Sequence, residues 1–159
     1  MQGSVYQLCL TDQDGGLPHP HVVVLTFSGN RDCIVVPAYS PDGFKINEYI
    51  RLCKNEGLSD DQIFVRLDNA KCIDFTAFFP PKEALWCIGR FRRVSQKAVQ
   101  EGTRVGQMKS AGLLEIATRL LALAEAEPDA LSVSAVKSLR NLVRGLAPPS
   151  PPPSEIAKE

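Results

Sequence analysis

The chain has 159 residues, enough for one domain with an appendage, and its 44% hydrophobic and 23% charged residues suit a globular protein with its own core. Its 18 Lys and Arg residues balance 18 Asp and Glu residues, which excludes a uniformly basic nucleic-acid binder and an acidic disordered tail. The longest apolar runs, 84–88 and 120–124, are far shorter than the ~20 residues that span a bilayer. The N-terminal residues lack the features of a secretory signal, so we expect a cytoplasmic protein without a membrane segment.

The first third of the chain predicts antiparallel strands. Residues 4–10 alternate between two faces, and residues 21–27 form a β-branched run typical of a strand covered on both sides. Residues 28–30 predict a tight turn into a strand over 32–36, so these two strands form a hairpin. Pro37 is predicted to end the second strand or to place its last residues at a sheet edge.

The middle of the chain mixes helix and strand signals. Apolar residues at helical spacing predict a helix over 46–53, and Gly57 supplies a C-terminal cap. Residues 59–62 have the form of a capping box, but the alternation over 63–67 favours a strand. The stretch has the outline of a helix-turn-helix but lacks a convincing second helix, which disfavours DNA recognition. Further strands are predicted over 71–75 and 84–94.

From residue 95 onward the pattern is helical. A helix is predicted over 95–107, with Ser95 as its N-cap, although two glycines weaken it by up to about 1 kcal/mol each. Apolar stripes predict two more helices over 113–124 and 136–146, whose short connection is typical of an antiparallel hairpin. We expect this hairpin to cover either the strand-rich part or a second copy of the chain. The predicted parts are a strand-rich domain with its first helix over 1–110, a helical hairpin over 111–146 and a disordered Pro-rich tail over 147–159.

The five cysteines show no paired spacing, and no histidine stands near them at the spacing of a metal site. Most have apolar neighbours, which is typical of buried thiols in a reducing compartment. No Gly-rich phosphate loop, paired metal carboxylates or nucleophile elbow is present, so we expect neither a cofactor nor a metal.

Residues 86–110 carry six Lys and Arg residues and one Glu, so this segment is strongly positive within a neutral chain. In a continuous strand, alternation would place Arg90 and Arg92 on one face and Arg93 on the other. Guanidinium groups at a strand end can bind phosphates, which makes these arginines candidates for RNA binding. The alternative is a solvated strand end that balances acidic residues elsewhere.

Two histidines, His19 and His21, alternate with prolines at the start of a predicted strand. Histidine can act as a general acid or base near neutral pH, which favours a catalytic role. The alternative is that one histidine belongs to a turn and the other packs against the sheet.

The order of these motifs resembles the PemK/MazF-like toxins over roughly residues 3–110. The segments that carry the resemblance are Gly3-Ser4-Val5-Tyr6, His19-Pro20-His21-Val22-Val23-Val24, residues 34–40, residues 63–67 and Gly89-Arg90-Phe91-Arg92-Arg93-Val94-Ser95. Members of this family are small SH3-like barrels that cleave single-stranded RNA as toxins of toxin–antitoxin pairs. The resemblance implies a mainly β fold, a small antiparallel SH3-like barrel of the PemK/MazF type with an α-helical extension.

The chain departs from the family pattern at the catalytic positions. His19 stands where the family has its catalytic arginine, and Ser40 matches the chemistry of the Thr or Ser at the end of the next strand. The family's acidic residue before the arginine has no clear counterpart, since Asp14 is the nearest carboxylate. Residues 43–60 and the helices after residue 110 also exceed the usual family length.

The resemblance implies a metal-independent endoribonuclease whose expected partners are single-stranded RNA, a cognate antitoxin and a second copy in a homodimer. The alternative is a catalytically inactive barrel that binds a protein or nucleic acid, favoured by the missing arginine and acidic residue. The candidate catalytic residues are His19 and Ser40, and the candidate RNA-binding residues are His21, Tyr39, Arg90, Arg92 and Arg93.

Overall fold

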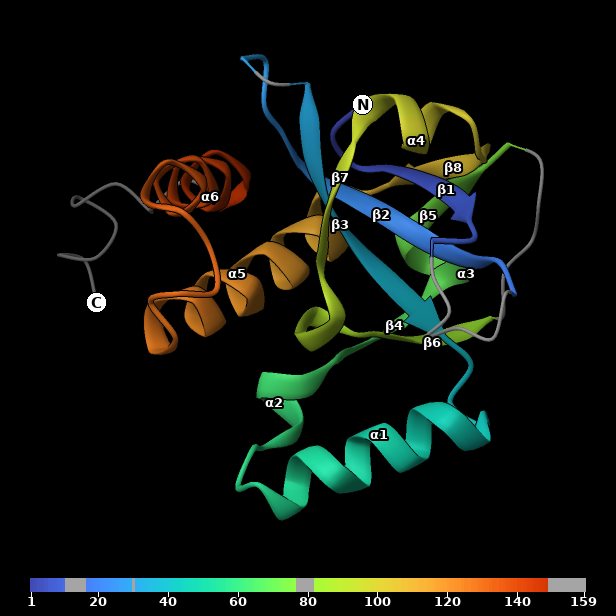
Figure 1. The fold of residues 1–159 in the computed structure, drawn as a ribbon. Helices are drawn as coiled ribbons and strands as arrows, with labels where there is room; N and C mark the ends of the chain where they lie inside the picture. The colour runs from blue at the N-terminus through green and yellow to red at the C-terminus, as the bar shows by residue number, and fades with distance from the viewer. Residues whose placement is uncertain (11–16, 30, 77–81, 149–159) are drawn as a thin grey trace, which may run out of the picture.

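The computed structural model describes residues 1–10, 17–29, 31–76 and 82–148 (Figure 1). Within these residues, eight antiparallel strands form one sheet that curls into a half-barrel. The order across the sheet is β4-β6-β3-β2-β1-β8-β5, and β7 pairs with β3. This confirms the predicted antiparallel, barrel-like sheet. The strands are β1 (Ser4–Leu8), β2 (His19–Thr26), β3 (Asp32–Tyr39), β4 (Val65–Asp68), β5 (Ile73–Phe75), β6 (Glu83–Trp86), β7 (Arg92–Ser95) and β8 (Thr103–Met108).

The long helices confirm three predictions made from helical periodicity. They are α1 (Phe44–Asn55), α5 (Ser110–Ala126) and α6 (Val133–Leu146), each a few residues longer than expected. The short helices are α2 (Asp60–Ile63), α3 (Asn69–Cys72) and α4 (Gln96–Gln100), and η2 (Ile88–Arg90) is a single 3-10 turn. No helix in the described part of the chain is both long and apolar enough to cross a membrane. The predictions for Asp14, Asn30 and residues 149–159 lie outside the described residues.

The prediction that Pro37 ends its strand or places it at a sheet edge is wrong, because β3 continues to Tyr39 and lies between β2 and β6. Pro37 pairs with His21 of β2, and its carbonyl oxygen accepts a hydrogen bond from the backbone N–H of Cys87 (2.8 Å). Proline lacks only the donor of a backbone pair, so its carbonyl can still join the sheet.

The predicted continuous strand over 84–94 is also wrong, because η2 interrupts it. β6 pairs with the end of β3 and β7 pairs with its beginning, so the two form one broken partner strand. Between them, the backbone N–H of Phe91 donates to the carbonyl of Ile88 (3.1 Å), and the Ile88 side chain is fully buried. The additional residues of η2 act like those of a β-bulge: they bend the chain between β6 and β7 and redirect the side chains there.

The predicted helix over 95–107 ends at Gln100, and the chain then enters β8. Ser95 is the N-cap as expected, since its hydroxyl accepts a hydrogen bond from the backbone N–H of Ala98 (3.1 Å). A Cβ atom at Gly102 would lie 2.7 Å from the carbonyl oxygen of Gln7. Glycine therefore permits the close approach of this turn to β1.

Two further strand predictions are shortened by helices. The capping box at Ser59 is present, and it begins α2, so that β4 starts only at Val65. α3 takes the first part of the strand predicted over 71–75. The side chain of Asn69 at the start of α3 accepts a hydrogen bond from the buried Trp86 indole (3.1 Å), which fixes this turn against β6.

The main core lies between one face of the sheet and α5. Its buried side chains come from β2, β3 and β6 and, on the helical side, from α5 (Leu113, Ile116, Ala117 and Leu120) and α6 (Ala135 and Leu139). α5 and α6 lie beside each other (Figure 1), as expected of a hairpin. α1 packs Ile46, Ile50 and Cys53 against Tyr39 and Leu85 in a separate cluster.

Candidate functional site

The pairing of β2 with β3 brings two candidate residues together. His21 is opposite Pro37, so the antiparallel register continues to His19 at the start of β2 and Tyr39 at the end of β3. The rings of His19 and Tyr39 have centroids 4.6 Å apart and planes tilted by 48°. This cross-strand contact holds the imidazole at the end of the sheet.

A recess of about 240 Å³ opens at this end, and we call it the His19 recess. It is lined by Gln7, Pro18, His19, Pro20, Ala38, Tyr39, Ser40 and Ala84. The recess therefore brings together both candidate catalytic residues, His19 and Ser40. Ser40 is exposed and directly follows β3, where its hydroxyl is accessible to a ligand.

Arg90, which ends the turn η2, also contacts Tyr39. Its Nη1 atom donates a hydrogen bond to the Tyr39 hydroxyl (3.3 Å), and its guanidinium lies 4.2 Å from the centroid of the Tyr49 ring. Burial, the largest single influence, lowers the pKa of Arg90, but the hydrogen bond with Tyr39 and the charge interactions with Tyr39, Cys87 and Tyr49 together outweigh it, so the pKa is raised above its ordinary value. Arg90 is therefore a fixed cation between two tyrosines.

The three candidate arginines separate into two groups. Arg90 and Arg92 line one recess of about 470 Å³ together with Tyr49, Gly89 and Phe91. Arg92 also donates a hydrogen bond to the carbonyl of Leu10 (3.4 Å). Arg93 pairs instead with Asp32 (3.1 Å) and lies over the Phe27 ring, so it does not join this group.

His21 does not line the His19 recess, although the sequence made it a candidate for RNA binding. It is only 1% exposed, and its Nδ1 atom lies 2.7 Å from the carbonyl oxygen of His19. A carbonyl oxygen can only accept, so Nδ1 must carry the proton. In this structure the ring stabilises the start of β2 and is not accessible to a strand of RNA.

Two residues of the site were missed by the sequence analysis. Gln7 lines the His19 recess and donates a hydrogen bond from Nε2 to the carbonyl of Pro18 (3.3 Å). Its Oε1 atom is buried and has no hydrogen-bond partner among the described residues. Tyr49 supplies an aromatic face to Arg90, yet in the sequence it stands only as one apolar position of a helical repeat. Neither residue carried a signal that distinguishes it from a core or strand residue.

Two of the thiols, Cys33 and Cys72, are disfavoured as nucleophiles. Burial, with a smaller contribution from Asp32, raises the pKa of Cys33 to about 11, and burial also raises the pKa of Cys72. In the described ranges, no group of three His, Cys, Asp or Glu residues could hold a metal ion.

The arrangement offers an imidazole and a hydroxyl at the His19 recess, and a guanidinium that lines a second recess and contacts the same tyrosine, Tyr39. An imidazole can accept and return a proton, and a guanidinium can stabilise the charge of a phosphate. The described lining of the His19 recess contains no carboxylate.

Comparison of the sequence with protein-family models and with curated proteins finds no match.

Proposed function

We propose that this protein is a metal-independent endoribonuclease that cleaves single-stranded RNA, with an SH3-like barrel of the PemK/MazF toxin type. The motif order described above and the antiparallel, curled sheet support this assignment. The same resemblance extends the proposal to a cytoplasmic toxin with a cognate antitoxin and a homodimeric state.

The observation that carries the proposal is the convergence of His19, Tyr39 and Ser40 on one recess. They belong to segments about 20 residues apart, and the register of β2 and β3 brings them to the same end of the sheet. Arg90 comes from a third segment and reaches the same tyrosine. These groups could supply the proton transfer and the charge stabilisation that phosphate transesterification needs.

In the proposed reaction, the 2′-hydroxyl of the RNA attacks the adjacent phosphorus atom. Neutral His19 takes the proton from this hydroxyl, and the new P–O2′ bond forms as the P–O5′ bond breaks. The imidazolium returns the proton to the departing 5′ oxygen. Ser40 donates a hydrogen bond to a non-bridging oxygen, and Arg90 stabilises the charge that develops there. The products are a 2′,3′-cyclic phosphate and a 5′-hydroxyl end.

The second candidate function is a catalytically silent barrel that binds RNA or a protein. The specific observation in its favour is that the described lining of the His19 recess contains neither a carboxylate nor an arginine. His19 would then contribute an aromatic face, as it does to Tyr39.

The test is cleavage of a mixed-sequence, single-stranded RNA by the purified protein in the presence of EDTA. We expect fragments with 5′-hydroxyl ends, and His19→Ala should slow their formation by about 10²–10⁴-fold, the usual contribution of a general acid or base. Arg90→Ala should also slow cleavage, by at least tenfold. Arg140→Ala removes the same charge from the exposed pair with Glu125 and serves as the matched control with near-normal cleavage.

Two outcomes would contradict the proposal. Equal cleavage by the wild-type and His19→Ala proteins would mean that the activity comes from elsewhere or from a contaminant. Binding of RNA without any cleavage would support the silent barrel instead.

A further inference from the structure

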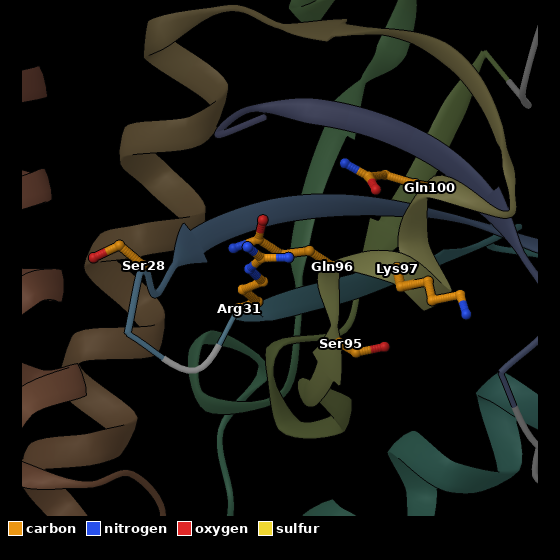
Figure 2. A pocket seen from close by; sticks show the side chains of 6 residues that line it. All are labelled: Ser28, Arg31, Ser95, Gln96, Lys97 and Gln100. Atoms are coloured by element: carbon orange, nitrogen blue, oxygen red, sulfur yellow. The ribbon is translucent and has the colours of Figure 1, made fainter.

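A separate recess lies at the other end of β3, between the β2–β3 turn and α4 (Figure 2). It has a volume of about 430 Å³ and is lined by Ser28, Arg31, Ser95, Gln96, Lys97 and Gln100, and we call it the Arg31 groove. At about 3.3 Å per residue, the length of β3 separates it from the His19 recess by roughly 20–25 Å. Neither the motifs in the sequence nor the proposed catalytic site accounts for it.

The Arg31 groove carries two positive charges, those of Arg31 and Lys97. Arg31 and Lys97 are both exposed, and neither forms an ion pair with a carboxylate of the described residues. Asp32, the acidic residue next to Arg31, pairs with Arg93. The other four lining residues are neutral, and three of them, Ser28, Ser95 and Gln100, can donate side-chain hydrogen bonds to a ligand. The groove therefore presents donors and positive charge in a chain whose net charge is zero.

The backbone of Arg31 is in an unfavourable conformation. Its φ angle is +55°, in the left-handed region that glycine or asparagine usually occupies. Gln96 holds this turn: its backbone N–H donates to the carbonyl of Arg31 (2.8 Å), and its Nε2 atom donates to the carbonyls of Phe27 and Asp32 (3.4 Å each). A long cationic side chain at a strained, fixed turn points to a role for that side chain.

The positions of the two cations favour an extended ligand. Figure 2 shows Lys97 extending away from Arg31, on the other side of Gln96, so the two charges do not converge on one point. A single small anion would contact one of them, whereas a chain of phosphates can contact both. The strand β7 connects this groove with the catalytic end, because Ser95 lines the groove and Arg92, three residues earlier, lines the recess beside Arg90.

We propose that the Arg31 groove binds the sugar–phosphate backbone of single-stranded RNA at nucleotides distant from the cleaved bond. The inference rests on the proposed function, since the same strand would occupy the His19 recess. Arg31 and Lys97 each contact one phosphate, and β7 lies along the path between the two sites. The groove adds affinity for long RNA without contacting the reacting atoms.

The experiment measures binding of fluorescent 2′-O-methyl RNA, which lacks the attacking hydroxyl, to the wild-type protein by anisotropy. Oligonucleotides of about 4 and about 16 nucleotides are compared, the range of common single-strand site sizes. Arg31→Gly should weaken binding of the long oligonucleotide by about fivefold to tenfold and leave the short one unchanged. It should also reduce the slope of log K against log salt by about 0.7, the value for one phosphate contact on a single strand.

The choice of variants separates binding from folding. Glycine fits a φ of +55° better than arginine does, so Arg31→Gly should keep or raise the thermal midpoint while affinity falls. Lys97→Ala should give a loss similar to that of Arg31→Gly. The matched control is Lys137→Ala, which removes an exposed cation from α6 and should leave binding unchanged.

The outcomes distinguish this inference from the proposed function. If the wild-type protein binds neither oligonucleotide, both proposals fail. If it binds the long one and the Arg31 and Lys97 variants do so equally well, only the groove is excluded. If a polyglutamate peptide binds as tightly as the RNA and loses the same affinity in Arg31→Gly, the groove accepts an acidic protein segment and the inference is overturned.

Discussion

Tyr39 is the residue at which the parts of the candidate site meet. Its ring contacts His19, its hydroxyl accepts a hydrogen bond from Arg90, and Ser40 follows it directly. Tyr39 is itself largely buried, so it provides a rigid partner for both side chains. A fixed partner reduces the side-chain entropy that the histidine and the arginine would otherwise lose when RNA binds.

Tyr49 is expected to position Arg90 through its ring. A cation–π contact contributes about 0.5–2 kcal/mol, so Tyr49→Ala should weaken RNA binding by about twofold to thirtyfold. Tyr49→Phe keeps the ring and should bind RNA nearly as well as the wild type, which anisotropy can measure. Burial raises the pKa of the Tyr49 hydroxyl well above its ordinary value, so this group stays neutral and adds no charge to the site.

The phenylalanine variant is also the control for this prediction. A loss in Tyr49→Phe as large as that in Tyr49→Ala would show that the hydroxyl, which lies close to Gly89, is the group that matters. A fall in thermal midpoint equal in both variants would assign Tyr49 to the packing of α1 alone.

At the scale of single residues, the sequence predicted part of the site. His19 was found from the two histidines that alternate with prolines, Ser40 was found through the resemblance, and the structure places both in one recess. Arg90 was found from the charge of its segment, but alternation along a strand gave the wrong reason for its position, because η2 redirects it. Gln7 and Tyr49 could not be predicted, since their roles arise from partners that are distant in the sequence.

At the scale of elements, Gly102 and Gly106 explain why the helix that begins after Ser95 is short and is followed by a strand. A Cβ atom at Gly106 would lie 2.9 Å from the Ile73 side chain, and Gly102 lies close to β1. The sequence showed both glycines as defects of a helix. Their real role is to let β8 pair closely with β1 and β5, which depends on contacts between distant segments.

Alanine substitutions at two glycines test this account. Gly102→Ala should lower the free energy of unfolding by about 1–3 kcal/mol, because the new methyl group would overlap Leu8 and the Gln7 carbonyl. Gly145→Ala is the matched control in α6, where no atom lies within 4 Å of the added Cβ, and it should raise the free energy by up to about 1 kcal/mol. Urea denaturation measures both, and equal midpoints in the two variants would refute the steric explanation.

Long elements were predicted better than short ones for a physical reason. α1, α5 and α6 each repeat their apolar pattern over several turns, and β1 to β3 alternate or stay apolar over most of their length. α2 and α3 have four residues each, too few for a periodic signal. Their positions follow from local caps and from tertiary contacts such as the bond between Asn69 and Trp86.

At the scale of the whole molecule, α5 packs against the sheet and covers one side of the main core. Ile116, Ala117 and Leu120 are fully buried together with side chains of β2, β3 and β6. α6 adds Leu139 to the same cluster and lies against α5. Without these helices this apolar face of the sheet would be exposed to water, so it depends on them for cover.

The stability of the sheet should therefore depend on the C-terminal helices. Leu120→Ala should lower the free energy of unfolding by about 2–5 kcal/mol, because it leaves a cavity in the shared core. Val133→Ala, at a position that is 89% exposed in α6, is the matched control and should change the free energy of unfolding by less than about 0.5 kcal/mol.

A chain truncated after Ser110 should fail to unfold cooperatively and should expose apolar surface to a dye, since the face that α5 covers would meet water. A soluble truncated chain with a sharp urea transition would show instead that the helices are a detachable appendage on a barrel that folds alone.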